Sequence, residues 1–179
     1  MNIFGMTWEE IFALLLSAMG PVGITMSYMP IAQALPSDIR RQLAWRTVLV
    51  GFLVAVGLML LGGGVVQRFH LRLAVLLMGV GVTYFVLAIP MLLAGPSDLS
   101  PPTHIKEPLR LAVSPLAVPA LISPLAVALL FSVSAFAPSL TAALIFVGIV
   151  VAVLIIDLGL MLLSTYVAQY LTKPILEVL

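Results

Sequence analysis

The stretch LAVSPLAVPALISPLAVALLFSVSAFAPSLTAALIFVGIVVAVLII, residues 111–156, contains no lysine, arginine, aspartate or glutamate. It fills the whole interval between Arg110 and Asp157, which is 46 residues (111 to 156) without a charge. A charged side chain costs about 2.5–3.5 kcal/mol at the centre of a transmembrane helix, so charge-free intervals mark where hydrocarbon surrounds the chain. This stretch therefore predicts a protein that lies in a lipid bilayer.

The composition of the whole chain agrees with that prediction. Of 179 residues, 63% are hydrophobic and 8% are charged, with a mean hydropathy of +1.25. A water-soluble domain of this size could not hide so much apolar surface in its core. The chain has no cysteine, which excludes disulfides and thiolate metal sites, and its net charge of +1 predicts no nucleic-acid partner.

Three further charge-free intervals, 11–37, 47–67 and 73–97, each suit one helix of about 20 apolar residues. The 46-residue interval is too long for one crossing and breaks at Ala137-Pro138-Ser139, so it predicts two. We therefore expect an all-α, polytopic transmembrane helix bundle. The expected spans are 8–35, 43–66, 71–94, 111–136 and 140–168. The last stretch, Leu171–Leu179, is too short to cross the membrane. In the second span, Gly62-Gly63-Gly64 either ends the helix or permits close packing.

The distribution of basic residues predicts the orientation of the chain. Eight lysines and arginines divide between the two sides of the membrane. One side carries Arg40, Arg41, Arg46, Lys106, Arg110 and Lys173, and the other carries Arg68 and Arg72. By the positive-inside rule the amino terminus of this multi-pass protein is outside. No basic residue precedes the first apolar run, so we expect no removable signal peptide.

Two short motifs indicate an internal repeat. Gly20-Pro21-Val22-Gly23 lies 103 positions (123 minus 20) before Ser123-Pro124-Leu125-Ala126, and both read small, proline, any, small. The chain then divides into a first repeat over 1–95, a proline-rich connection over 96–110 and a second repeat over 111–179. Each repeat would have three helices, so the second copy must be inverted in the membrane. The same offset places the counterpart of the third helix at about 174–197. We therefore expect a sixth helix, from at least about 18 further residues or from another chain.

The prolines of the first and fourth spans predict helix interruptions. Pro21 removes the amide that would bond the Ser17 carbonyl, and Pro124 does the same to the Ala120 carbonyl. Interrupted helices at membrane depth are tolerated where the backbone is covered by protein or lines a wet cavity, and paired interruptions are a pointer to a substrate site. The alternative is that the prolines only kink helices for packing. The candidates for a solute path are Ser17, Gly20, Pro21, Gly23, Pro119, Ser123 and Pro124, together with Asp157.

Asp157 is the ionisable residue that lies deep inside a predicted span. An intramembrane carboxylate is by default a functional candidate. It would be a proton-coupling group if it is neutral when occluded and charged when open. The alternative is structural: Asp157 lies near a helix end and snorkels, or it hydrogen-bonds Ser164, Thr165 or a neighbouring subunit.

Other features favour structural roles. Gly79 and Gly81 give the third helix a small surface where another backbone could approach. Such glycine-rich faces could bind other membrane subunits or a second copy of the chain. His70 and His104 have no second ligand at metal spacing, so we expect no metal and no cofactor. The chain has no nucleophile elbow, zinc-helix motif or phosphate loop, so we expect no enzymatic activity.

Several motifs resemble those of the MarC family of bacterial inner-membrane proteins. They are Gly20-Pro21-Val22-Gly23, the run Leu35-Pro36-Ser37-Asp38-Ile39-Arg40-Arg41-Gln42-Leu43-Ala44, Ser114-Pro115-Leu116-Ala117-Val118-Pro119 and Ser123-Pro124. The resemblance covers nearly the whole chain. That family is similar to the LysE exporter superfamily, which implies six helices and a transporter or exporter of small solutes.

The chain departs from the family pattern at three places. Gly20 stands where the family has asparagine, Ser123 and Leu125 stand where it has glycines around the proline, and Leu77 stands where the third helix often carries arginine. An amide and an intramembrane cation are groups that would line a polar path. Their absence leaves an alternative open, in which the chain is a non-transporting accessory or structural subunit of a larger membrane complex.

Overall fold

The computed structural model describes residues 6–70, 72–93, 108–135 and 139–176, and these residues form helices without a strand. The elements in chain order are α1 (Trp8–Met19), α2 (Pro21–Gln33), α3 (Ser37–Arg68), α4 (Leu73–Leu93), the 3₁₀ helix η2 (Pro108–Ala112), the π-type segment η3 (Val113–Leu121), α5 (Pro124–Ala135) and α6 (Leu140–Leu176). The expected all-α helix bundle is confirmed.

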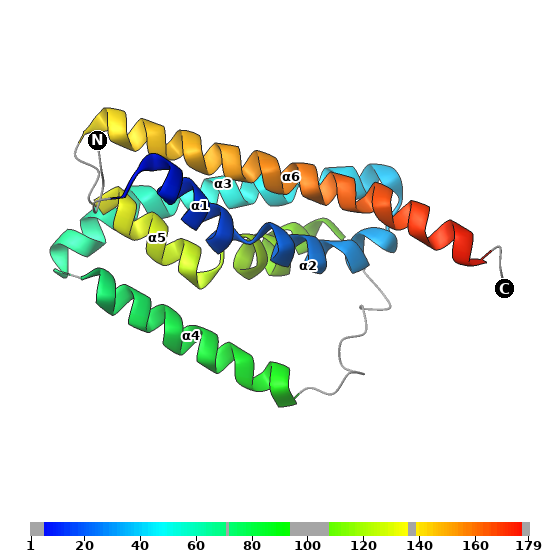
Figure 1. The fold of residues 1–179 in the computed structure, drawn as a ribbon, viewed down its shortest axis with the longest axis horizontal. Helices are drawn as coiled ribbons and strands as arrows, with labels where there is room; N and C mark the ends of the chain where they lie inside the picture. Colours follow the sequence, from blue (N-terminus) through cyan, green and yellow to red (C-terminus); the bar gives the residue numbers. More distant parts are fainter. Residues whose placement is uncertain (1–5, 71, 94–107, 136–138, 177–179) are drawn as a thin grey trace.

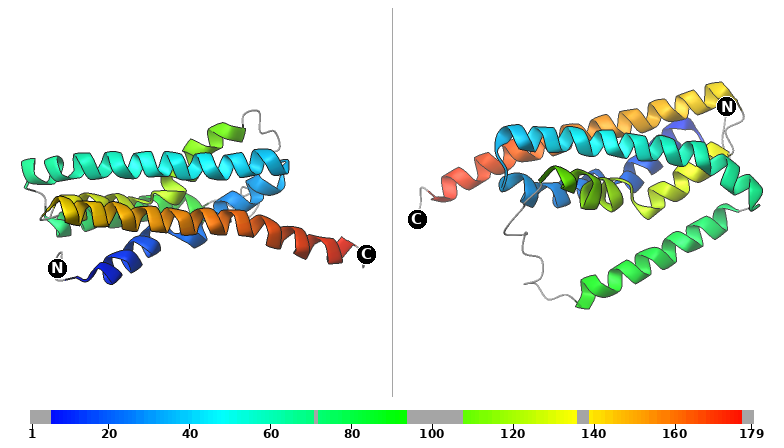
Figure 2. Two further views of the ribbon diagram at one scale, coloured as in Figure 1. Left: turned by 90° about the horizontal axis from the view of Figure 1, so that it is seen from above. Right: turned by 180° about the vertical axis from the view of Figure 1, so that it is seen from behind.

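The two longest helices, α3 and α6, run side by side along the length of the molecule in opposite directions (Figures 1 and 2). The α1–α2 pair and the η3–α5 pair cover one side of this central layer, whereas α4 diverges from the bundle as it leaves the α3–α4 turn. Three stretches are long and apolar enough to cross a membrane, Trp8–Gln33, Ser37–Val66 and Leu140–Ser164, and Ala74–Val86 and Pro124–Ala135 are shorter apolar helices.

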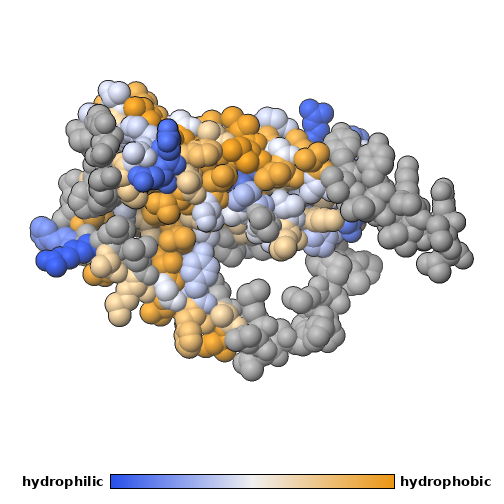
Figure 3. Space-filling view, in the orientation of Figure 1, coloured by the Kyte–Doolittle hydropathy of each residue, from blue (hydrophilic) through white to orange (hydrophobic). Residues whose placement is uncertain are grey.

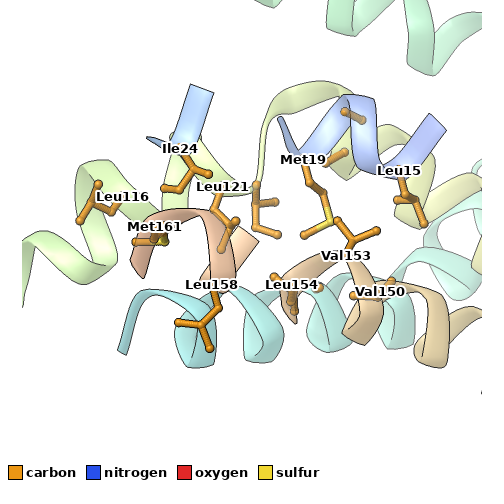
Figure 4. Packing of buried hydrophobic residues seen from close by; sticks show 14 of the residues in the cluster. Leu15, Met19, Ile24, Leu116, Leu121, Val150, Val153, Leu154, Leu158 and Met161 are labelled. Carbon is orange, nitrogen blue, oxygen red and sulfur yellow. The ribbon is translucent and has the colours of Figure 1, made fainter. Parts of the chain in front are cut away.

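The core forms where α6 faces α1, α2 and η3. Val150, Val153, Leu154, Leu158 and Met161 recur at helical spacing on α6, and all are buried. They meet buried leucine, isoleucine and methionine side chains of the opposite elements (Figure 4). Large apolar side chains also cover much of the outer surface (Figure 3), as a helix bundle in lipid requires.

The first helix begins at a capping box. The Thr7 amide donates to the Glu10 carboxylate at 2.7 Å, and the Glu10 amide donates to the Thr7 hydroxyl at 3.3 Å. Two of the amides that a helix start leaves unpaired are thereby satisfied. The pattern Thr7-Trp8-Glu9-Glu10 is enough to predict this start, because every partner lies within one helical turn.

The second predicted span is longer than expected. Of the two roles expected for its glycine triplet, close packing holds and the helix end does not. α3 covers Ser37–Arg68 instead of 43–66, so Gly62-Gly63-Gly64 lies inside the helix and does not end it. A Cβ on Gly62 would lie 2.7 Å from Phe131 Cδ1 and 2.8 Å from Phe131 Cα. Of the three glycines, Gly62 therefore lies closest to α5.

The last helix also runs beyond its expected end. α6 extends to Leu176 instead of ending near 168, so Leu171–Leu176 continues the same helix and does not form a separate segment. The proline-rich connection predicted over 96–110 lies mostly outside the described residues, which resume at Pro108. The inverted relation of the two halves stays a prediction.

Candidate functional site

The first helix interruption lies at Gly20, between α1 and α2. Gly20 has φ 64° and ψ 71°, the left-handed conformation that glycine adopts without a Cβ clash. Its amide donates to the Leu16 carbonyl at 3.2 Å, which closes α1, and Pro21 then occupies the first position of α2. The dipeptide Gly20-Pro21 thus ends one helix and starts the next at membrane depth.

The second interruption is longer than the single break expected at Ser123-Pro124. Within η3, Ser114 (φ −139°, ψ 127°) and Val118 (φ −135°, ψ 122°) are extended, and each directly precedes a proline, Pro115 or Pro119. Proline disfavours helical geometry in the residue before it, so two prolines four residues apart prevent a regular helix over 113–121. The regular helix α5 starts only at Pro124.

Ser123 joins the two interruptions. Its hydroxyl donates to the Ala18 carbonyl of α1 at 2.5 Å and accepts the Ala126 amide of α5 at 3.2 Å. The first bond satisfies a carbonyl near the end of α1, and the second caps the start of α5. One side chain therefore fixes the end of one broken helix against the beginning of the other, across 105 positions of sequence.

The candidate path residues divide into two groups. Gly20, Pro21, Ser123 and Pro124 are all partly buried and lie at the two interruptions. Ser17 and Gly23 are exposed on the outside of the bundle, and nothing lies within 4 Å of the position of a Cβ on Gly23. Pro119 belongs to η3, and its side chain lies outside the described part of the structure.

Asp157 is fully buried, with 0% of its surface exposed. Neither carboxylate oxygen has a hydrogen-bond partner among the described residues. Two of the structural alternatives for Asp157 can be compared with the described residues: snorkelling from a helix end and a hydrogen bond to Ser164. The structure shows neither. α6 continues 19 residues beyond Asp157 (176 minus 157), so the side chain does not snorkel from a helix end, and the Ser164 hydroxyl donates instead to the Met161 carbonyl at 2.8 Å.

The helical register of α6 places Asp157 opposite the first interruption. Val153, Asp157 and Met161 are four residues apart and share one face of the helix. Figure 4 shows Met19 directed toward Val153, and Met161 beside Ile24 and Leu121. Met19 and Ile24 bracket Gly20-Pro21 in the sequence, so the carboxylate faces the bundle at the level where α1 ends and α2 begins.

Two further buried positions in the bundle were not predicted from the sequence. Gly51 of α3 is buried, and a Cβ there would overlap the Leu121 side chain at the end of η3. Ser132 of α5 is 1% exposed, and its hydroxyl has no partner among the described residues. Neither carries a sequence signal, because glycine and serine are common wherever transmembrane helices pack closely.

The site has few groups that could perform chemistry. Within the described residues, no three His, Asp or Glu side chains lie close enough together to hold a metal ion. The polar groups at the interruptions and on the facing side of α6 are the Ser123 hydroxyl, the Ala18 carbonyl that it bonds, and the Asp157 carboxylate. Such groups can bind a small polar solute or an ion.

A bundle of apolar helices with interruptions that meet inside it defines a polytopic α-helical membrane protein. The family model of MarC family integral membrane proteins matches residues 6–179, and the chain belongs to this family. Comparisons with curated proteins and with solved structures find no match.

Proposed function

We propose that this protein transports small solutes across the bacterial inner membrane, with its amino terminus outside, and that it is not an enzyme. The solute path would pass the junction of the two interrupted helices. The observation that supports this proposal most is the Ser123 hydroxyl, which links the Ala18 carbonyl to the start of α5. Its position makes the junction a polar point inside a largely apolar bundle.

Asp157 supports the same proposal. An ionised carboxylate that is buried without a partner costs several kcal/mol, so this arrangement favours a proton or a cation on Asp157. A protein with a purely structural role gains nothing from that cost, whereas a transporter can use it to couple opening to proton binding. Asp157 would therefore be the proton-coupling residue.

A solute screen tests the proposal. The purified protein is reconstituted into vesicles, which are incubated with a mixture of amino acids, sugars and small organic acids, and the trapped solutes are identified by mass spectrometry. We expect at least one solute to enter wild-type vesicles faster than protein-free ones, and Ser123→Leu to abolish the difference. Equal entry for every solute in the mixture would contradict transport of these classes.

Thiol accessibility tests the location of the path. The chain has no cysteine, so single substitutions can be read without a background. Ser123→Cys should react with a water-soluble thiol reagent in membranes, and the buried Ser132→Cys within α5 should not. If neither cysteine reacts from either side of the membrane, water does not reach the junction.

The alternative function, a non-transporting subunit of a larger membrane complex, is favoured by a different observation. The grooves on the described surface are apolar, and α4 leaves most of its described side chains exposed. Other subunits or a second copy of the chain would then cover α4. Mild extraction from native membranes followed by mass spectrometry of co-purifying chains distinguishes this function, because a transporter that acts alone should be recovered alone.

A further inference from the structure

A groove of about 390 Å³ lies between α4 and the η3–α5 region. On the α4 side it is lined by Leu76, Gly79, Val80 and Thr83, and on the opposite side by apolar side chains such as Val127 and Phe131. The hydroxyl of Thr83 already donates to the Gly79 carbonyl at 2.9 Å. The groove therefore offers its occupant an apolar surface and no free side-chain donor from Thr83.

A positive charge lies at one end of this groove. Leu76, Val80 and Thr83 lie three or four residues apart on one stripe of α4, and Arg72 continues that stripe one turn earlier. The helical register includes Arg72 because its carbonyl accepts the Leu76 amide at 3.3 Å. Arg68, the last residue of α3, and Arg72 are both exposed, and no ion pair joins either to another residue that the structure describes. Figure 3 shows this turn as a hydrophilic projection beside an apolar surface.

The length of the stripe matches one leaflet of a bilayer. From Arg72 to Thr83 the rise is about 16 Å at 1.5 Å per residue. Half of a hydrocarbon core of about 30 Å is about 15 Å. With Arg72 at the headgroup level, Thr83, the last α4 residue that lines the groove, lies near the bilayer midplane. The groove thus has the reach of a single acyl chain rather than of a helix that spans both leaflets.

The charge at the end of the groove favours the same occupant, because an apolar helix would leave both arginines without a counter-charge. We propose that the groove binds one acyl chain of an anionic phospholipid, whose phosphate lies between Arg68 and Arg72. The groove borders the second interruption, since Ile122 and Pro124 line it, but the proposal does not depend on transport.

The test uses phosphatidylcholine vesicles that contain a minor fraction of phosphatidylglycerol. The full-length protein is reconstituted, extracted and examined by native mass spectrometry for bound lipid. We expect wild type to retain phosphatidylglycerol in preference to phosphatidylcholine, because each arginine near the membrane surface favours an anionic headgroup by about fivefold. Arg68→Gln and Arg72→Gln should each lower the preference about fivefold, and the double substitution should abolish it.

Two glycines of α4 supply matched variants for the apolar part. Both Gly79 and Gly81 have open space at the position of a Cβ, but only Gly79 lines the groove. Gly79→Leu should therefore eliminate the retained lipid, and Gly81→Leu should leave it unchanged. Gel filtration and circular dichroism verify folding, and the arginine variants, at exposed positions, test the proposal even if Gly79→Leu does not fold.

Three outcomes would overturn the proposal. The first is equal retention of the two lipids by wild type. The second is an equal loss of lipid in Gly79→Leu and Gly81→Leu. The third is a disulfide-linked dimer of Thr83→Cys in membranes under oxidising conditions, because that result would place a second copy of the chain in the groove.

Discussion

Replacement of Ser123 by alanine should destabilise the protein by about 2 kcal/mol. The substitution removes the cap of α5, which is worth about 1 kcal/mol. It also removes the bond to the Ala18 carbonyl, and hydrogen bonds between transmembrane helices contribute about 0.6 kcal/mol on average and up to about 1.7 kcal/mol. The substitution loses both contributions together, because the same hydroxyl makes both hydrogen bonds.

Ser139→Ala is the matched control for this substitution. The Ser139 hydroxyl accepts the Ala142 amide at 3.2 Å, the same capping distance as at Ser123, but the structure gives it no bond to another helix. Ser139→Ala should therefore cost only about 1 kcal/mol. The difference between the two substitutions measures the bond that joins α1 to α5.

Thermal unfolding in detergent, followed by circular dichroism, gives the comparison. With about 2–4 °C per kcal/mol for a chain of this length, Ser123→Ala should lower the midpoint by about 4–8 °C and Ser139→Ala by about 2–4 °C. Ser123→Thr, which retains the hydroxyl, should restore most of the loss. Equal shifts for the two alanine variants would refute the view that Ser123 holds the interruptions together.

Three further substitutions test other parts of the structure. Gly62→Ala should destabilise the protein by about 1–3 kcal/mol, because the added Cβ meets the Phe131 backbone. Gly63→Ala should be neutral or stabilising by up to about 1 kcal/mol. Equal midpoints in thermal unfolding would contradict the close approach of α3 and α5 at Gly62. Gly20→Ala should cost about 1–2 kcal/mol by the same assay, since alanine is strained at φ 64°, and an unchanged midpoint would mean that α1 and α2 join differently. Asp157→Asn should leave the protein folded and abolish the pH dependence of solute entry into vesicles, because the amide retains the size and removes the ionisation; an unchanged pH profile would exclude Asp157 from coupling.

Local patterns in the sequence were sufficient for several features of the fold. The capping box at Thr7 and Glu10, and the interruption at Gly20-Pro21, depend on partners within one helical turn, so the residue types specify them directly. The extended geometry of Ser114 and Val118 was also within reach, because each precedes a proline. Pro124 alone predicts one break in the fourth span, whereas Pro115 and Pro119 extend the interruption over 113–121.

The role of the glycines required the tertiary structure. Gly62, Gly63 and Gly64 are identical in type and adjacent, yet only Gly62 meets a neighbouring backbone closely. Which of the three faces α5 depends on the rotation of α3 within the bundle, and that rotation is set by packing over its whole length. A sequence pattern carries no such information.

By itself, the sequence determined that the chain is a bundle of membrane helices, because the cost of burying charge in lipid leaves long charge-free intervals wherever the chain crosses. It also indicated the first interruption at Gly20-Pro21 and the end of the second at Pro124, because proline acts on its own backbone and on the residue before it. Only the tertiary structure decided that Ser123 reaches Ala18, that Asp157 is buried without a partner among the described residues, and that α4 and α5 border an apolar groove. These features join residues far apart in the chain, and contacts of that kind depend on how the helices pack rather than on any local preference.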